Sequence, residues 1–549
     1  MNVGGRKGGR RLWLLLASLL IAAPLAAQTP DEGFAALLAG LKDASFPDKE
    51  AIAERVLGSS HSAALPTMTG WLEDRLYVRP DGAVVLVKTA DESLPAMELI
   101  DPTSQQPAGT APPAELTKIN TNNRLRRFLR TALARYALAN PDRSVRLSAV
   151  TEMLRSLDDA SVELLRQRAA EETDAAVKYQ IETGLALAAL DGSDRDARLA
   201  AIETLGGRLG ADVRNRLAVL VEQAPDGSFV EPDADVRRAA TEALAGIDTS
   251  RSLYAAVETM FFGLSLGSVL VLVAIGLAIT FGVMGVINMA HGELMMLGAY
   301  TTYVVQGLMP GAISWSLAVA IPAAFLVAAL AGMLLERTVI RFLYGRPLET
   351  LLATFGVSLL LQQFVRSVFS ANNRAVSTPS WMSGTWQINE ALSLTFNRLY
   401  IVAFTIIVFG LVMLVLRRTR LGLEIRAVSQ NRAMARAVGI RSDRVDVLTF
   451  GLGSGIAGVA GVALSQLTNV GPNLGQSYII DSFMVVVFGG VGNLWGTLIG
   501  GMSLGITNKL LEPYAGAVLG KILVLVALIL FIQRRPRGMF PLKGRAAEA

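Results

Sequence analysis

The stretch Gly282-Val283-Met284-Gly285-Val286-Ile287-Asn288-Met289-Ala290-His291-Gly292-Glu293 decides the fold, because it places three polar side chains between long apolar runs. Asn, His and Glu are costly at membrane depth unless they face a partner or a wet cavity. Asn288 and His291 are three residues apart and would share one face of a helix, with Glu293 offset. The flanking glycines favour an interrupted helix whose backbone helps to line a path. The alternative is a hydrogen-bonded contact that holds two helices together.

The region around this stretch reads as a set of membrane helices. The 549-residue sequence is 52% hydrophobic and 18% charged, whereas soluble proteins carry about 25% charge. From Leu253 onward, apolar runs approach the ~20 residues that cross hydrocarbon. These runs are 257–279, 288–305, 317–335, 351–369, 399–416 and 448–467, and the glycine-broken remainder covers 478–532. We therefore predict an all-α class, with a polytopic membrane domain over 252–549.

Arginine placement predicts the orientation of these helices. Lys and Arg gather in cytoplasmic loops, and here they concentrate in 337–346, 417–444 and 534–545. The loop 370–398, which contains Asn, Ser and Trp, should then face outward. An outside domain before the first helix and an inside tail require an odd number of crossings. We expect about nine, with 478–511 crossing as two short segments or a re-entrant pair.

A second stretch, 417–440, predicts a short amphipathic helix on the cytoplasmic side. Its Ala, Met and Val residues favour helix, and Gly439 is a natural stop. Ile425, Val428 and Met434 fall near one face, with arginines elsewhere. A helix of this kind lies on lipid headgroups or docks into a partner protein. The arginines alone favour the lipid surface.

A third stretch, 485–501, is dense in glycine and permits close helix approach or a broken helix. No Lys-Ser or Lys-Thr follows the glycines, so this is not a phosphate-binding loop. Gly520-Lys521 is not a phosphate-binding loop either, because Ile522 follows the lysine. The sequence has no cysteine and only His61 and His291 as histidines, which excludes thiolate chemistry and histidine-rich metal sites. We predict no catalytic residues, no metal and no cofactor.

The first half of the chain is predicted to lie outside the membrane. A basic start, an apolar run and small residues near Ala27 describe a signal peptide over 1–28, with an uncleaved anchor as the alternative. Residues 29–119 form an extracytoplasmic region in which 80–113 reads as short strands or loop. Residues 120–251 read as a HEAT-like helical repeat region, with a non-repetitive bundle as the alternative. Each repeat should begin at an acid that caps a helix, namely Asp142, Asp174, Asp196 and Asp235.

Together, the three stretches resemble the permease subunits of the branched-chain amino-acid ABC importer family over roughly 253–542. The end of the match is Arg535-Pro536-Arg537-Gly538-Met539-Phe540. The resemblance implies an inner-membrane protein that works with a second homologous permease, two cytoplasmic ATPases and a periplasmic substrate-binding protein. It also implies that 424–440 is the coupling helix that fits an ATPase cleft, in place of the lipid surface. The coupling residues would be Glu424, Ile425, Arg426, Ala427, Gln430, Asn431, Ala435 and Gly439.

A signal peptide and a long helical domain before the permease resemble the urea-transporting branch of this family. The expected function is import of urea by alternating access, with ATP hydrolysis in the partner subunits. Urea is neutral and needs hydrogen-bond donors and acceptors along its path. The candidate path residues are Asn288, His291, Glu293, Gln362, Gln466 and Asn493. The alternatives are a branched-chain amino-acid importer, an ATP-independent urea channel, and a sensor whose external domain binds the ligand.

Overall fold

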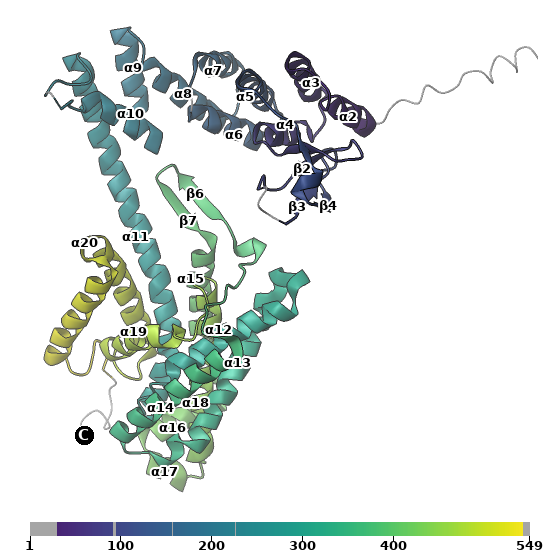
Figure 1. Ribbon diagram of the computed structural model, residues 1–549. Helices are drawn as coiled ribbons and strands as arrows, with labels where there is room; N and C mark the ends of the chain where they lie inside the picture. The colour runs from purple at the N-terminus through teal and green to yellow at the C-terminus, as the bar shows by residue number, and fades with distance from the viewer. Residues whose placement is uncertain (1–29, 92–94, 156, 226, 542–549) are drawn as a thin grey trace, which may run out of the picture. The chain divides into compact units, whose positions relative to one another are not determined.

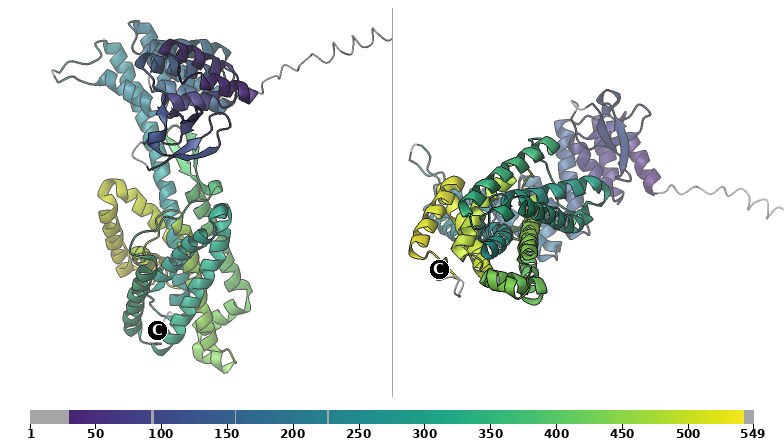
Figure 2. Two further views of the ribbon diagram at one scale, coloured as in Figure 1. Left: turned by 45° about the vertical axis from the view of Figure 1, so that its right-hand side comes forward. Right: turned by 90° about the horizontal axis from the view of Figure 1, so that it is seen from below.

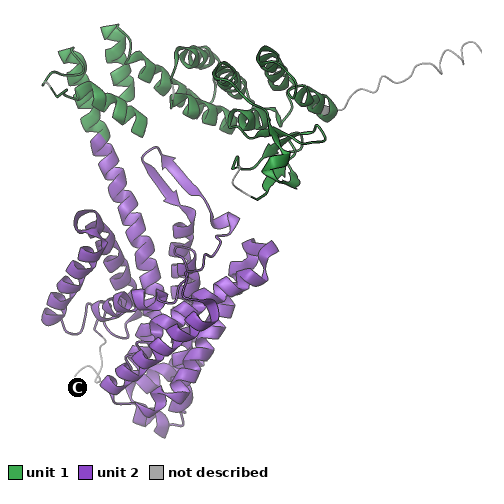
Figure 3. Ribbon diagram, in the orientation of Figure 1, with its two compact units in different colours: residues 1–247 green, residues 248–549 purple. Residues whose placement is uncertain are grey.

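The computed structural model describes residues 30–541, apart from 92–94, 156 and 226. The predicted signal peptide at 1–28 lies outside the described residues. The chain divides into two compact units, Met1–Ile247 and Asp248–Ala549 (Figure 3). The long helix α11, Ala234–Met284, begins in the first unit and ends in the second.

The first unit begins with three helices and a small antiparallel sheet. The helices are α2 (Pro30–Ala39), α3 (Phe46–Gly58) and α4 (Ala64–Leu72). The sheet has the order β4-β3-β2-β1-β5, with β1 at Leu76–Val78, β2 at Val84–Val87, β3 at Met97–Ile100, β4 at Pro107–Ala111 and β5 at Thr117–Lys118. The short helix η1, Pro113–Glu115, precedes β5. Strands were expected only as one reading of 80–113, so the all-α class is wrong for this unit.

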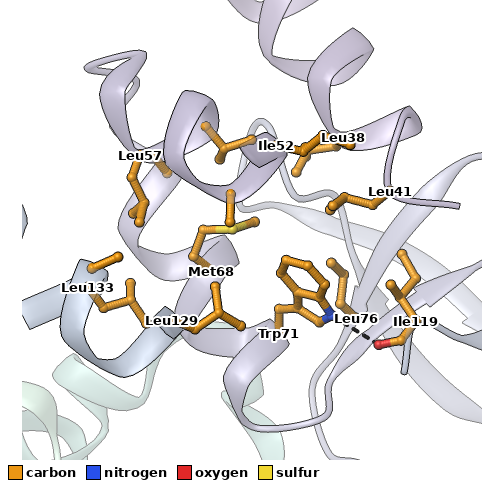
Figure 4. Close-up of a cluster of buried hydrophobic side chains, with 14 of the residues drawn as sticks. Leu38, Leu41, Ile52, Leu57, Met68, Trp71, Leu76, Ile119, Leu129 and Leu133 are labelled. Atoms are coloured by element: carbon orange, nitrogen blue, oxygen red, sulfur yellow. Dashed lines mark hydrogen bonds between the residues drawn. The ribbon is translucent and has the colours of Figure 1, made fainter. Parts of the chain in front are cut away.

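Trp71 lies at the centre of the core that joins these helices to the sheet (Figure 4). The side chain is fully buried, and its indole N–H donates a 2.9 Å hydrogen bond to the carbonyl of Ile119. A buried indole needs a partner for its N–H, and the chain just after β5 supplies it. This contact ties α4 to the chain that leads into the following helices.

The rest of the described first unit before α11 is a run of six helices, and an Asp or Asn side chain caps the N-terminus of all but the last. They are α5 (Asn123–Leu138), α6 (Arg143–Leu154), α7 (Asp159–Glu171), α8 (Ala175–Ala189), α9 (Arg195–Leu205) and α10 (Ala211–Val221). Asp142 and Asp174 cap α6 and α8 as predicted. The predictions for Asp196 and Asp235 are wrong by two residues, because Asp194 and Asp233 accept the first-turn N–H groups instead. Both sequences read Asp-x-Asp, and the first Asp takes the cap.

One contact recurs at two of the predicted repeats. Arg146, four residues after its capping Asp, donates to the carbonyls of Asn140 and Pro141. Arg237, four residues after Asp233, donates to the carbonyls of Glu231 and Pro232 in the same way. In both places the arginine closes the loop before its own helix, so two distant segments repeat one local structure.

Six helices are long and apolar enough to cross a membrane, counted over the described residues. They are Ala234–Met284, Pro310–Phe342, Pro347–Phe369, Phe396–Arg418, Ser442–Ser465 and Leu494–Arg534. In helix labels these are α11, α13 (Ile313–Thr338) with its short flanking helices η2 (Pro310–Ala312) and η3 (Ile340–Phe342), α14 (Pro347–Phe369), α15 (Phe396–Arg418), α18 (Ser442–Ser465) and α20 (Leu494–Arg534). The estimate of about nine crossings stays a prediction.

Two further helices complete the membrane domain, α12 (His291–Leu308) and α19 (Leu474–Gly489). Helix α20 is broken at Gly516, whose φ is +73°. Outside the membrane helices lie α16 (Arg420–Gln430), α17 (Arg432–Ala437), the 3-10 turn η4 (Ser380–Met382) and a hairpin of β6 (Thr385–Asn389) and β7 (Leu392–Thr395). The hairpin is a second departure from the all-α prediction.

Helices α12, α13 and α18 pack side by side in the second unit (Figures 1 and 2). Glycine allows the close approaches. A Cβ on Gly298 of α12 would lie 2.0 Å from the carbonyl oxygen of Gly458 on α18. A Cβ on Gly475 of α19 would lie 2.4 Å from the carbonyl oxygen of Gly292 on α12. Such contacts of small residues replace hydrophobic burial as the packing force between membrane helices, and they fix α12 between α18 and α19.

Candidate functional site

A buried polar cluster joins α12 to α14. One carboxylate oxygen of Glu293 accepts a 2.9 Å hydrogen bond from the Ser358 hydroxyl and a 2.8 Å hydrogen bond from the Gln362 side-chain amide. All three residues are buried. The second carboxylate oxygen, Oε2, has no hydrogen-bond partner within the described residues. The cluster therefore combines hydroxyl and amide groups with an acceptor that is open to a further donor.

The chain just before α12 is held by its own polar groups. Helix α11 ends at Met284, Gly285 has a φ of +66°, and the next helix begins at His291, so the predicted interruption is confirmed. Asn288 accepts a 3.0 Å hydrogen bond from the Ala290 N–H, and Thr354 of α14 accepts one of 3.1 Å from the Met289 N–H. Because Asn288 lies in the non-helical link, the prediction that it shares a helical face with His291 is wrong.

His291 opens α12 and is fully buried. Its Nε2 lies 3.0 Å from the carbonyl oxygen of Val273 on α11, and Nδ1 has no partner among the described residues. A Cβ on Gly276 would come within 2.8 Å of the imidazole ring, so only glycine leaves room for it. His291 thus bridges α11 and α12, which matches the alternative of a contact that holds two helices together.

The structure separates the other two path candidates from this cluster. Gln466, just after α18, lines an apolar cavity of about 320 Å³ whose wall includes Trp381 and Tyr400. Asn493 caps α20, and its amide donates a 3.1 Å hydrogen bond to the carbonyl of Phe540. In the part of the chain that the structure describes, neither residue forms a hydrogen bond with Asn288, His291 or Glu293. The six candidates therefore do not form one site.

Four polar residues form a stripe along one face of α14, and the sequence prediction named only Gln362 among them. Thr350, Thr354, Ser358 and Gln362 follow one another at four-residue spacing, and all are buried. Residues four apart share one face of a helix, so the stripe points as a whole toward the interrupted segment and α12. The spacing is visible in the sequence and is the signal that would have identified Ser358.

The predicted coupling segment folds as two helices and not one. Asn431 ends α16 and caps α17, accepting a 2.9 Å hydrogen bond from the Met434 N–H. Ile425 and Val428 are buried, whereas Met434 is 61% exposed, so the prediction that the three fall near one face is wrong. The break at Asn431 changes the helical register, and Ala435 turns inward instead. Gly439, with a φ of +89°, follows the end of α17, so the predicted stop is confirmed.

Polar contacts fix these two helices. Arg432 forms a bidentate ion pair with the buried Asp446 of α18, with distances of 2.7 and 2.8 Å. Glu424 pairs with Arg420 one turn earlier at 2.9 Å, and Arg426 donates to the carbonyl of Leu416. A bidentate arginine pair fixes orientation as well as distance. The ion pair therefore fixes α17 to α18.

Tyr344 lies beside this ion pair. The Arg432 guanidinium lies 5.0 Å from the centre of the Tyr344 ring, and the phenol donates a 3.2 Å hydrogen bond to Glu336. Burial raises the pKa of Tyr344, and the nearby Asp446 and Glu336 carboxylates raise it further. The phenol therefore stays protonated at neutral pH and acts as a donor.

A large basic cavity lies between α16, the ends of α11 and α15, and the turn before α20. Its volume is about 770 Å³. Polar lining residues include Arg417, Arg426, Gln430, Asn493 and Arg537. Within the described residues no group of His, Asp and Glu side chains could hold a metal ion. The cavity therefore provides hydrogen-bonding groups and positive charge.

Comparison with known proteins connects these features to a family. Residues 259–532 match the family described as branched-chain amino acid transport system, permease component. The permease protein LivH of a high-affinity branched-chain amino acid transport system in Salmonella typhimurium is 33% identical over 293 residues. That alignment covers 94% of the relative and 52% of this chain. The chain belongs to this permease family.

Two further relatives are less similar to this chain than LivH. The BraD permease protein of Pseudomonas aeruginosa is 29% identical over 298 residues, which cover 96% of BraD and 52% of this chain. The ribose import permease protein RbsC of Escherichia coli is 26% identical over 276 residues, which cover 81% of RbsC and 48% of this chain. No solved structure matches. As a permease component, the chain is a transport subunit and not an enzyme.

Proposed function

We propose that this permease is the membrane subunit of an ATP-binding-cassette importer that carries urea by alternating access. Its partners are a second homologous permease, two ATPase subunits and an external substrate-binding protein. The family match over 259–532 supports the importer, and the buried cluster of Glu293, Ser358 and Gln362 is the observation that supports a small polar cargo. Urea presents N–H donors and a carbonyl acceptor, which complement a carboxylate, a hydroxyl and an amide.

The substrate path follows from this cluster. Glu293, Ser358 and Gln362 make contact with the cargo, and Asn288 and His291 hold the broken segment beside them. Gln466 and Asn493 lie apart from this cluster, one beside the apolar cavity and one beside the basic cavity. The second permease supplies the rest of the site. An unwound segment between two membrane helices is where transporters of several folds place their substrates.

The coupling step uses α16 and α17. Glu424, Ile425, Arg426, Ala427, Gln430, Asn431, Ala435 and Gly439 form this segment, and its exposed face fits the ATPase. The ion pair of Arg432 with Asp446 carries the movement of α17 into α18. Helix α18 packs on α12 and α13, so a rigid shift reaches the segment that holds Glu293. Rigid-body movement of packed helices is the usual form of alternating access.

The first unit lies outside the membrane in this proposal, and the C-terminus lies in the cytoplasm of a bacterial inner-membrane protein. Residues 1–28 act as signal peptide, 29–119 form a mixed helix and sheet domain, and 120–251 form a HEAT-like repeat domain. The repeated arginine contacts of Arg146 and Arg237 support the repeat. The unit lies outside the family match, and its presence before the permease supports the urea branch.

A branched-chain amino acid is the second candidate cargo. The names of the LivH and BraD relatives favour it, since both belong to branched-chain amino acid transport systems. A zwitterion would need a cation for its carboxylate as well as an anion for its amine. The residues hydrogen-bonded to Glu293 include no cation, and the nearby Arg366 of α14 donates a 2.7 Å hydrogen bond to Asn473 instead. This arrangement favours a neutral solute.

Uptake in cells separates these cargoes. The gene is deleted in its native host, and uptake of labelled urea and labelled leucine is measured at limiting concentration, with the full-length chain restored as control. We expect loss of urea uptake and unchanged leucine uptake. Loss of leucine uptake alone would show that the cargo is a branched-chain amino acid, and the importer assignment would stand. Urea uptake that persists after depletion of ATP would point to a channel.

A further inference from the structure

The basic cavity beside α16 is lined by three arginines, of which only Arg426 belongs to the proposed coupling segment. Its lining residues include Arg417, Arg426 and Arg537, and no Asp or Glu among the described residues lines it. The three arginines come from the end of α15, from α16 and from the segment after α20. Three guanidinium groups around one cavity repel one another unless an anion lies between them.

The three arginine side chains have N–H donors that no other described residue accepts. Arg426 donates one N–H to the carbonyl of Leu416, which leaves its other donors available. In the part of the chain that the structure describes, the side chains of Arg417 and Arg537 form no hydrogen bond or ion pair. Ser429, Gln430 and Asn493 add uncharged polar groups to the same wall. This set suits a phosphate group, which accepts several hydrogen bonds at once.

The remaining wall is apolar and comes from membrane helices. Ala278, Ile279 and Val283 lie at the end of α11, and Leu494 and Trp495 lie at the start of α20. The Trp495 ring packs edge-on against Phe409 of α15 with 5.1 Å between ring centres. Trp gathers at the level of the lipid headgroups. A free anion would gain nothing from such a wall, whereas a lipid places its headgroup on the arginines and its first methylenes on the apolar residues.

We propose that this cavity binds the headgroup of an anionic phospholipid. Basic pockets between membrane helices on the cytoplasmic side recognise such lipids. The bound phosphate neutralises Arg417, Arg426 and Arg537 together and so links α15, α16 and the C-terminal segment. The inference depends on membrane insertion, which the family establishes, and not on the cargo.

Lipid retention tests the site without any transport assay. The full-length permease, co-expressed with its partner subunits, is extracted in mild detergent, exchanged into bilayer discs of phosphatidylglycerol and phosphatidylcholine, and re-extracted for native mass spectrometry. The test variant is Arg417→Gln with Arg537→Gln. The matched control is Arg418→Gln with Arg535→Gln, because these exposed neighbours carry the same charge and do not line the cavity.

We expect the wild-type chain and the control to retain phosphatidylglycerol and the test variant to lose it, with phosphatidylcholine retained by none. Equal retention by test and control variants would overturn the inference, as would a wild-type chain that retains no anionic lipid. A further sample is washed with inorganic phosphate before re-extraction. Displacement of the lipid by phosphate at ordinary buffer concentration would show a simple anion site and would also overturn it. Thermal unfolding of each variant confirms that loss of lipid is not loss of fold.

Discussion

The side-chain amide of Gln362 on α14 donates a 2.8 Å hydrogen bond to the carboxylate of Glu293 on α12, and both side chains are buried. Much of the remaining surface of α14 is exposed and apolar, including Leu348, Leu352 and Leu360. The polar stripe is therefore the face by which this helix is attached to α12. A transporter that moves α14 or α12 must open or reshape this cluster.

Substitution of Glu293 tests whether this side chain contacts the transported solute or only holds α12 against α14. Glu293→Gln keeps the size of the side chain and one acceptor, so the free energy of unfolding should change by about 1 kcal/mol or less. The KM for the transported solute should rise about tenfold, which corresponds to one lost hydrogen bond of about 1.4 kcal/mol. Glu349→Gln, on the exposed first turn of α14, is the control. Unchanged KM with a large loss of stability would assign the cluster to packing alone.

The contact between α12 and α19 should not tolerate a methyl group. Gly475→Ala places a Cβ 2.4 Å from the Gly292 carbonyl oxygen, and overpacking of this kind costs about 1–3 kcal/mol. We expect a lower unfolding temperature in detergent. Gly356→Ala on α14, where a Cβ meets nothing within 4 Å, should leave it unchanged or raise it. An equal response of the two variants would contradict the close helix approach.

Loss of Arg432 should damage the coupling segment more than loss of another arginine nearby. Arg432→Ala leaves the carboxylate of Asp446 buried without its partner, at a cost of about 3–5 kcal/mol. ATP hydrolysis by the assembled complex should then no longer drive uptake. Arg441→Ala removes an exposed arginine and serves as the control. Arg432→Lys should restore part of the activity, since one ion-pair contact can form again.

The first unit should lose stability in acid through Glu172. Burial alone would raise the pKa of this carboxyl, but hydrogen bonds from Arg146, the Asp174 N–H and Arg168 outweigh it and lower the pKa from 4.5 to about 2. The stabilisation is thus complete above pH 4.5 and is lost as the pH falls toward about 2. Hydrogen exchange of peptides from α6 to α8 measures it. Glu172→Gln should be destabilised at neutral pH and lose this acid dependence.

The neighbouring Glu171 provides the control for that measurement. Its side chain is 76% exposed and lies 3.8 Å from Arg168, so Glu171→Gln should follow the wild-type curve. If Glu171→Gln and Glu172→Gln behaved alike, the buried ion pair would not be the source of the acid sensitivity.

Local signals in the sequence predicted the parts of the site that depend on neighbouring residues. The glycines on both sides of the polar residues identified the interruption before α12, and Gly439 identified the end of α17. The pairing of Glu293 with Ser358 was not predicted, because it joins residues 65 positions apart and depends on how α12 meets α14. The separation of Met434 from the face of Ile425 and Val428 was not predicted, for a different reason. Asn431 caps a new helix there, and the hydrogen bond of its own side chain resets the register.

Tertiary contacts determine the hydrogen-bond partners of Asn493. In the sequence it is one polar residue in a glycine-rich membrane stretch, which favours a path residue. In the structure its side chain caps α20 and holds the returning C-terminal segment, where the Met539 and Phe540 N–H groups donate to the carbonyls of Phe488 and Gly489. That return of the chain cannot be read from local spacing.

The most direct test of the account is uptake by the purified complex in vesicles. The complex contains this permease, its partner permease, both ATPases and the binding protein, and labelled urea and labelled leucine are each supplied with and without ATP. We predict urea uptake that requires ATP, persists in Arg418→Ala and is lost in Arg426→Ala with Gln430→Ala. Uptake of leucine alone would contradict the cargo. Urea uptake that proceeds equally without ATP would contradict the importer itself.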